Sequence, residues 1–450
     1  MPRFSFVVIA YNVERYIEKC VESIKSQTFS DFEVIIVDDC STDATASIVD
    51  NAIAEDSRFS LVRRRVNAGA HIARKTGAGR THGRYLLFID GDDCVRPDLC
   101  ERLDTEFQRD DVDILRFGLE VSSTDAPLDF RRALEDSFNL DTGLRRGHEI
   151  LQSIFSETFP QRGNWSVEDC CFEGDFARES FAMMTEQSLG RMEDAYEFFV
   201  LADRARSMRV INDYRGLLYS YGAGDSGNGN QPREKFEKGQ RGIHDSLQAL
   251  MDYSASHDDE IHRECSAWMR RTTLGIVGRD WSGRMPMEDQ IHSFPALRDT
   301  WQPSEVAYIV SEPLYARAVF VWQAGGYPDY QDPLVQWAQL LMSVPRQDDR
   351  DERVTAKVRM CRELCSAIEH REDSRMQAGF LAWARMHEAD RQNDLRARIE
   401  RARATEVQAV EEYEASKAGV ARAIGHRMLP AGTRRREVVR ALARRSLHRL

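Results

Sequence analysis

Two short acidic clusters hold the side chains of this sequence that are best suited to chemistry. Asp38 and Asp39 end one apolar segment, and the run Asp90–Asp93 ends another. Neighbouring carboxylates repel one another and take up protons unless a cation or hydrogen-bond donors compensate their charge. Carboxylate oxygens on a short turn suit Mg²⁺ or Mn²⁺, which keep open positions for substrate phosphates. Each cluster alone is also explained as an ordinary acidic turn, but the two together favour a site.

The elements that must position these clusters alternate between strands and helices. Helical patterns separate the predicted strands, which are the mainly apolar segments 4–10, 32–37, 59–62, 85–89 and 113–117. Asn12 is placed to cap the first of these helices. Such β-α-β alternation implies a mostly parallel sheet with helices on both faces, in which ligands bind beyond the carboxyl ends of the strands. Both acidic clusters lie at that edge.

Several segments around the clusters form an ordered set. In chain order they are Val7–Asn12, Gln27–Glu33, Val37–Asp43, Asn67–Arg74 and Gly83–Asp93. This set resembles glycosyltransferase family 2. The similarity is dense over residues 3–118 and specific as a set, whereas each segment alone is weak. The resemblance implies a GT-A fold, which is Rossmann-like, a nucleotide-diphosphate-sugar donor with UDP-sugar as the default, a divalent metal ion, and inversion at the anomeric carbon.

The resemblance also implies a donor site. Ala10, Tyr11 and Asp39 would form the nucleotide pocket, with Asp39 reading the edge of the base. Asn67 and Arg74 would flank the nucleotide or its diphosphate. For Arg74 the other interpretation is an arginine on a helix surface that pairs with a neighbour.

Within the acidic turn, the resemblance assigns Asp92 and Asp93 to the ribose and the metal ion, and it puts Asp90 at the start of the motif. Which of the three carboxylates touches Mg²⁺ or Mn²⁺ directly stays open. A metal ion there would neutralise the charge that develops on a diphosphate leaving group.

An inverting transferase also needs a general base to take the proton of the acceptor hydroxyl. The resembled family uses an acidic residue of a Glu-Asp pair that opens a helix, and Glu193 and Asp194 precede a helical pattern here. Asp194 is therefore the predicted catalytic base. The other interpretation is that both acids merely stabilise the helix dipole. Cys170–Phe172 stand where polysaccharide-type relatives carry a basic residue, a departure that leaves a non-catalytic scaffold as an alternative.

The chain divides into three predicted parts: a catalytic domain at 1–230, a helical domain of unknown role at 231–416 and a basic tail at 417–450. From about residue 231, long charged stretches replace the strand patterns. His244, His257 and His262 lack the spacing of metal ligands and are predicted to be surface or packing residues. The Gly-rich segment that precedes the helical part is explained equally well as a mobile lid or as a connector.

The basic tail differs from the rest of the chain in charge. Residues 417–450 contain nine arginines and one lysine against the single Glu437, which gives this segment a charge of +9. Because the whole chain has a net charge of −12, the other 416 residues together carry −21. An acidic body argues against nucleic-acid binding. A basic amphipathic helix can lie on an anionic membrane, so peripheral membrane contact through the tail is one expectation. A solvated or partner-docking tail is the other.

Composition narrows the class of protein. The chain is 42% hydrophobic and 30% charged, which is typical of a soluble globular protein, and no apolar run reaches the length of a membrane span. The N-terminus lacks the pattern of a signal peptide, and nine scattered cysteines suit a reducing compartment. The protein is therefore expected to be cytoplasmic, at the inner face of the cell membrane if the tail binds lipid.

These patterns together predict a metal-dependent, inverting hexosyltransferase. It would move a sugar from a nucleotide-sugar donor to a hydroxyl of a glycan or lipid-linked acceptor during the synthesis of cell-surface polysaccharide. A sugar nucleotidyltransferase is a further alternative. Such an enzyme needs a Gly-rich, basic phosphate loop after the first strand, where Tyr11–Glu14 stand instead.

Overall fold

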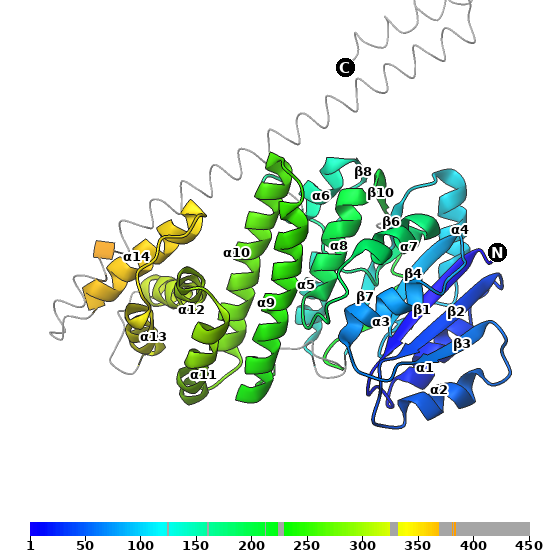
Figure 1. Cartoon of the computed structure of the whole chain (residues 1–450), viewed down its shortest axis with the longest axis horizontal. Helices are drawn as coiled ribbons and strands as arrows, with labels where there is room; N and C mark the ends of the chain where they lie inside the picture. Colours follow the sequence, from blue (N-terminus) through cyan, green and yellow to red (C-terminus); the bar gives the residue numbers. More distant parts are fainter. Residues whose placement is uncertain are drawn as a thin grey trace, which may run out of the picture. The chain divides into compact units, whose positions relative to one another are not determined.

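The computed structural model of the chain describes residues 1–123, 126–159, 162–211, 213–223, 229–324 and 332–368, together with 380, 382 and 383 (Figure 1). Residues 1–386 form one compact unit. The predicted domain boundaries after residues 230 and 416 stay predictions, and the predicted tail at 417–450 lies outside the described residues.

The main element is a mixed sheet of eight strands, most of whose long strands are parallel. Its order is β3 (Phe59–Arg63), β2 (Phe32–Asp38), β1 (Phe4–Ala10), β4 (Tyr85–Asp90), β9 (Cys170–Glu173), β6 (Ile114–Arg116), β10 (Ser207–Val210) and β8 (Leu144–Arg146). Pairing is parallel from β3 to β4 and between β6 and β10, and β9 runs antiparallel between β4 and β6. The predicted α/β fold class is confirmed.

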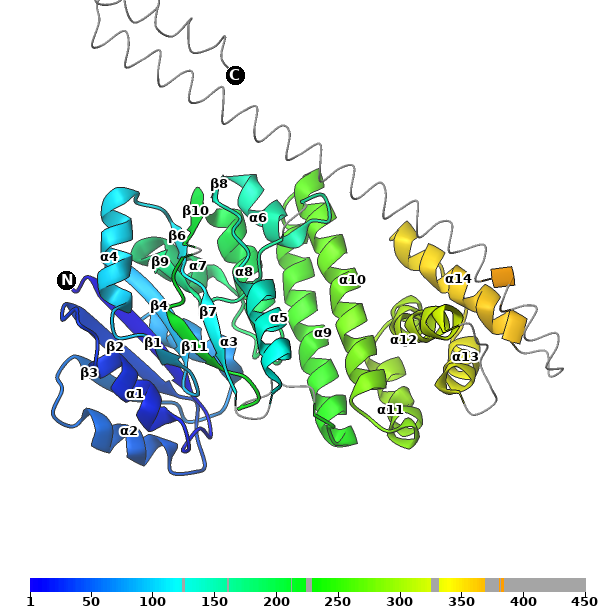
Figure 2. The same ribbon diagram turned by 180° about the vertical axis from the view of Figure 1, so that it is seen from behind.

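The two faces of the sheet bury separate apolar cores, because successive side chains of a strand point to opposite faces. Phe4, Phe6 and Val8 of β1 pack against one face, where α1 (Ile17–Lys25), α2 (Thr45–Ile53) and α4 (Leu99–Arg109) lie. Val7 and Ile9 pack on the other, under α3 (Gly69–Ala78), α6 (His148–Phe155), α7 (Gly174–Met183) and α8 (Glu193–Arg204). Figures 1 and 2 show these two layers from opposite sides.

A second, three-stranded sheet holds the acidic turn from the side. β11 (Leu217–Ser220) pairs with β5 (Cys94–Val95) and with β7 (Leu119–Ser122), which is followed by α5 (Leu128–Phe138). β5 begins directly after Asp93, so this pairing fixes the end of the turn.

One local prediction is wrong. Asn12 does not cap the first helix, since α1 begins only at Ile17. Asn12 instead adopts a left-handed conformation with φ 53°, and its side-chain oxygen accepts a hydrogen bond of 2.8 Å from the backbone N–H of Thr42. The asparagine thus ties the end of β1 to the loop after β2, because its short polar side chain both tolerates positive φ and bonds locally.

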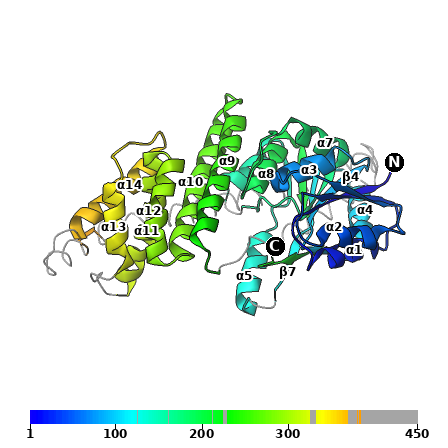
Figure 3. The ribbon, with the colours of Figure 1, turned by 60° about the horizontal axis from the view of Figure 1, so that its bottom comes forward.

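The helical region that the sequence predicts is confirmed over its described residues. It comprises α9 (Arg233–Ala255), α10 (Glu260–Gly283), α11 (Met287–Thr300), α12 (Pro303–Gln323), α13 (Pro333–Ser343) and α14 (Glu352–Ile368). Most of its apolar residues form a core of their own, but Leu250 of α9 and Trp268 of α10 belong to the core under α8. The first two helices therefore pack against the part of the chain that contains the eight-stranded sheet, as Figure 3 also shows. Among the described residues, no helix is long and apolar enough to span a membrane.

Candidate functional site

A pocket of about 810 Å³ lies where the carboxyl ends of β1, β2 and β4 meet. Six of the predicted site residues line it: Ala10, Tyr11, Asn67, Asp39, Asp90 and Asp92. Glu193 at the start of α8 lines it as well, and so do residues of α9 and Arg284, which follows the end of α10. Arg74, Asp93 and Asp194 are not among the lining residues.

Asp39 holds the start of α3 at the edge of this pocket. Its carboxylate accepts hydrogen bonds from the backbone N–H groups of Ala68 (3.0 Å) and Gly69 (2.7 Å), and Arg64 Nε lies 2.9 Å from it. Burial raises the pKa of Asp39, against the effect of these donors. Gly69 has φ +85°, and a Cβ there would lie 2.6 Å from the carbonyl oxygen of Leu189, so the close approach needs glycine.

Arg74 lies behind the pocket and gathers four carboxylates, which we call the Arg74 cluster. Its side chain is 2% exposed. The contacts of its Nη atoms are 3.0 Å to Asp90, 2.6 Å to Glu168, 3.2 Å to Glu193 and 3.1 Å to Glu197. The predicted pairing of Arg74 with a neighbour is present, but on a buried face rather than on the helix surface. One guanidinium cannot compensate four carboxylates, so the cluster has an excess of negative charge.

The acids that reach the pocket have raised pKa values. Burial raises the pKa of Asp90 to about 8, although Arg74 opposes the shift. Burial likewise raises the pKa of Glu193 to about 7, against Arg74 and with Glu197 adding to it. The pKa of Asp92 is raised by burial and by the nearby charge of Glu168. A bound cation would relieve this repulsion.

Asp93 is buried and joins the acidic turn to β11. It is 2% exposed, and its Oδ1 accepts a hydrogen bond of 2.7 Å from the backbone N–H of Ser220 in β11. Burial, followed by the charges of Asp92 and Asp90, raises its pKa well above the ordinary value. In this structure Asp93 therefore links the turn to the second sheet, while Asp90 and Asp92 reach the pocket.

Asp194 occupies the first turn of α8. Met192, just before the helix, adopts a left-handed conformation with φ 64°, which a residue other than glycine rarely does. The Asp194 carboxylate accepts a hydrogen bond of 2.9 Å from the N–H of Ala195. Burial and then the charge of Glu193 raise its pKa well above the ordinary value. Asp194 thus combines a helix-dipole position with the raised proton affinity that a general base needs.

Sequence reasoning did not find Glu168 and Glu197. Glu197 also lies 2.9 Å from Nδ1 of the buried His71, so it is shared between α3 and α8. Its position one turn after Glu193 was the only available signal. Glu168 has none, because it precedes a short strand in a segment without periodicity. The departure at Cys170–Phe172 is explained by burial, since both cysteines and Phe172 are 0% exposed in β9.

Another group of potential metal ligands lies away from this pocket. Asp203, His257 and His262 bring their ligand atoms within 4.8 Å of one another. The two imidazoles stack with centroids 4.1 Å apart and an interplanar angle of 3°, and their Nε2 atoms lie 3.5 Å and 3.0 Å from the Asp203 carboxylate. Asp203 also accepts a hydrogen bond of 2.7 Å from the hydroxyl of Tyr253. The structure thus brings together two of the histidines for which the sequence predicts surface or packing roles, and that role stays a prediction.

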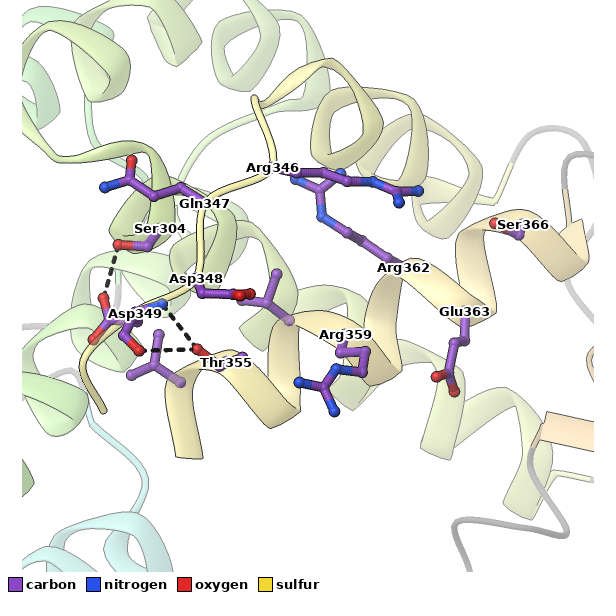
Figure 4. Close-up of a pocket in the computed structure, with 12 residues that line it drawn as sticks. Ser304, Arg346, Gln347, Asp348, Asp349, Thr355, Arg359, Arg362, Glu363 and Ser366 are labelled. Carbon is purple, nitrogen blue, oxygen red and sulfur yellow. Dashed lines mark hydrogen bonds between the residues drawn. The ribbon is translucent and has the colours of Figure 1, made fainter. Parts of the chain in front are cut away.

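The helical region has a pocket of its own, of about 290 Å³, between the segment before α14 and α14 itself (Figure 4). Arg346, Arg359 and Arg362 line it, as does Asp349, which accepts a hydrogen bond of 2.7 Å from Ser304. None of the predicted site residues lines this pocket.

Comparisons with known proteins bear on the catalytic half. Residues 5–171 match the family model described as glycosyl transferase family 2. The uncharacterized glycosyltransferase EpsJ of Bacillus subtilis (strain 168) is 36% identical over 125 residues, which cover 28% of this chain and 36% of that protein. The succinoglycan biosynthesis protein ExoO of Rhizobium meliloti (strain 1021) is 38% identical over 125 residues, 28% of this chain and 35% of that protein. The match thus spans about a third of the length of these relatives.

Solved structures with a similar arrangement share little sequence. The structure of TarS 1-349 from S. aureus in complex with UDP-GlcNAc is 18% identical in sequence to this chain. The match covers 73% of this chain and 93% of the TarS chain, with a TM-score of 0.48. The mannosyltransferase PcManGT from Pyrobaculum calidifontis, in complex with GDP-Man and Mn²⁺, is 14% identical in sequence to this chain. The match covers 80% of this chain and 86% of the PcManGT chain, with a TM-score of 0.41.

Proposed function

We propose that this chain, whose residues 5–171 form a glycosyl transferase family 2 domain, moves a sugar from a nucleotide-diphosphate sugar to an acceptor hydroxyl with inversion. The observation that carries the proposal is one pocket lined by Asp39, Asp90 and Asp92 from the sheet edge and by Glu193 from α8. UDP-sugar is the proposed donor, and a glycan or lipid-linked acceptor of cell-surface polysaccharide synthesis is the proposed substrate. The name of the succinoglycan protein among the relatives supports polysaccharide synthesis.

The donor half of the proposed site is the sheet edge. Ala10, Tyr11 and Asn67 would contact the nucleotide, and Asp39 its base. Asp90 and Asp92 would hold a divalent cation, Mg²⁺ or Mn²⁺. Their hard oxygen ligands and the excess negative charge around them fit such an ion. The ion would supply charge neutralisation for the departing diphosphate.

Arg74 is proposed to act as a positioning residue rather than as a donor ligand, since its Nη atoms are engaged by Asp90 and Glu193 among others. The pair of contacts holds the metal side and the α8 side of the pocket at a fixed separation. Two groups that must act on the same sugar from opposite directions need such a fixed separation.

Asp194 is the proposed general base. Glu193 beside it forms an ion pair with Arg74, which opposes the rise in its pKa that burial causes. The Asp194 carboxylate has no arginine contact among the described residues, and its pKa is raised. A carboxylate with raised pKa accepts the proton of an attacking hydroxyl more readily.

The first experiment is a screen of nucleotide sugars against the full chain with and without Mn²⁺, read by thermal stabilisation and by donor hydrolysis. We expect one donor class to stabilise the protein only with metal. Asp92→Asn should remove the metal-dependent part, and Asp98→Asn, outside the pocket, serves as the control. If no nucleotide sugar binds, or if Asp92→Asn binds as wild type does, the donor site is wrongly assigned.

The membrane-face location is proposed from the charge of residues 417–450 alone. Full-length protein should sediment with anionic liposomes at low salt, and a chain shortened to residue 416 should not. Equal sedimentation of both would rule out the tail as the membrane contact.

A further inference from the structure

One wall of the donor pocket comes from α9, which contributes three basic side chains and one acidic side chain, Asp245. Lys235, Lys238 and Arg241 follow one another at intervals of three along this helix, and all three line the pocket. Lys238 and Arg241 are exposed, and neither forms an ion pair or a hydrogen bond with any residue that the structure describes. Glu237, four residues before Arg241, pairs instead with Arg233 at 3.4 Å, so Arg241 is not held in an ion pair on its own helix.

The backbone of α9 is held directly against the segment that leads into Glu193 and Asp194. A Cβ on Gly242 would lie 2.9 Å from Cα of Gly190, so two glycines make the contact. Beside it, Arg191 Nη1 forms an ion pair of 2.5 Å with Asp280 of α10. The basic stripe therefore lies on a helix that contacts the segment leading into Asp194, and Figure 3 shows α9 alongside α8.

From this placement, and resting on the proposed function, we infer that the acceptor is an anionic glycan whose phosphate or carboxylate groups bind Lys238 and Arg241. The donor diphosphate has its own source of positive charge, since Asp90 and Asp92 are suited to a divalent cation. The stripe adjoins the α8 side, where an acceptor hydroxyl must meet Asp194.

The test measures acceptor binding and donor hydrolysis on the same variants of the full chain. Three probes of matched length separate the chemistries: a glycerol-phosphate oligomer, an oligogalacturonate and a neutral maltooligosaccharide. The test variant is Lys238→Glu with Arg241→Glu. Its matched control, Arg263→Glu with Arg298→Glu, changes the net charge equally at exposed positions that do not line the pocket. Lys238→Arg with Arg241→Lys keeps the charge and should keep binding.

We expect one anionic probe to bind the wild-type protein and the control in a salt-dependent manner. Its affinity for the test variant should be lower by about tenfold or more. Donor hydrolysis should fall by a smaller factor than acceptor binding, since the proposed donor and metal contacts are made by Asp39, Asp90 and Asp92 rather than by the α9 side chains. Equal binding of the neutral probe, unchanged binding in the test variant, or a loss confined to the donor would each overturn the inference. Failure of every nucleotide sugar in the donor screen would instead overturn the proposed function.

Discussion

Two groups of arginines and carboxylates, one around Arg74 and one around α10, differ in how their charges are balanced and in the direction of their pKa shifts. In the Arg74 cluster a single buried arginine faces four carboxylates, and the pKa values of Asp90 and Glu193 are raised. In the helical half, Arg270 and Arg271 of α10 share four carboxylates, Glu305 and Asp349 with Arg270 and Glu157 and Asp351 with Arg271. We call this second group the α10 network.

The α10 network is nearly balanced, because Arg353 adds a third positive charge at Glu157. Burial alone would raise the pKa of Asp349, but the hydrogen bonds from Arg270 lower it below the ordinary value, and Glu157 behaves in the same way under Arg271. The comparison teaches that carboxylates with nearly as many arginines beside them stabilise the fold, whereas carboxylates in large excess over arginine are held there at a cost. Such a cost is typical of sites that bind a cation or move a proton.

The largest effect should come from removing the central arginine. Arg74→Met leaves four carboxylates without a buried counter-charge and should lower the free energy of unfolding by about 3–5 kcal/mol near neutral pH. Arg270→Met should cost less, about 1–3 kcal/mol, because Asp349 keeps the hydroxyl of Ser304. Urea denaturation followed by circular dichroism measures both. Equal losses would mean that the two clusters do not differ in the way described.

The second effect concerns catalysis at the α8 side of the Arg74 cluster. Asp194→Asn should bind donor as wild type does and transfer sugar about 100-fold more slowly or worse, because the hydroxyl proton has no acceptor. Glu193→Gln, which removes an ion pair with Arg74, is the informative neighbour. Steady-state transfer kinetics on the identified donor decide between them. Normal turnover in Asp194→Asn with collapse in Glu193→Gln would move the base by one residue.

The third effect separates the clusters by their response to metal. Mn²⁺ should raise the melting temperature of the wild-type protein. The Asp90→Asn variant should bind the ion with an affinity lowered by about tenfold or more. Asp349→Asn in the α10 network should leave metal affinity unchanged, since that carboxylate is fully engaged. Calorimetric titration with Mn²⁺ gives the affinities. A loss of affinity in both variants would indicate an indirect effect of instability.

The smallest effect is a difference in the sign of pH dependence. Asp90 and Glu193, with pKa values of about 8 and about 7, take up protons in the folded state at pH values where the unfolded chain does not. The free energy of unfolding of the metal-free protein should therefore rise as the pH falls from about 8.5 to about 6. Asp349 has a lowered pKa, so its contribution is present above its ordinary value of 3.8 and is lost as the pH falls below it.

Asp90→Asn and Asp349→Asn sharpen this prediction. The first substitution should reduce the slope above about pH 6, where Glu193 still contributes, and the second should reduce the slope below about pH 4.5. Denaturation midpoints across the pH range measure both slopes. A slope of the same sign in the two windows would contradict the assignment of the excess charge to the Arg74 cluster.

Much of the fold could be predicted because its signals are local. The strand segments at 4–10, 32–37 and 85–89 are apolar except for Ser5 and Glu33, as is typical of a strand buried on both faces, and the structure contains all three. The position of Asn12 could not be predicted from the same kind of signal. Its side chain bonds to Thr42, 30 residues away, instead of to the adjacent helix.

The sequence by itself determined the edge of the sheet at which Asp39, Asp90 and Asp92 lie, because apolar strands of parallel direction place their carboxyl ends together. It also marked Asp194 as the first turn of a helix. Only the tertiary structure decided that Glu168, 94 residues from Arg74 along the chain, joins the cluster, and that Arg74 lies behind the pocket. It decided as well that α9 forms a pocket wall. Such contacts depend on how the helices pack on the sheet, and local periodicity carries no information about that packing.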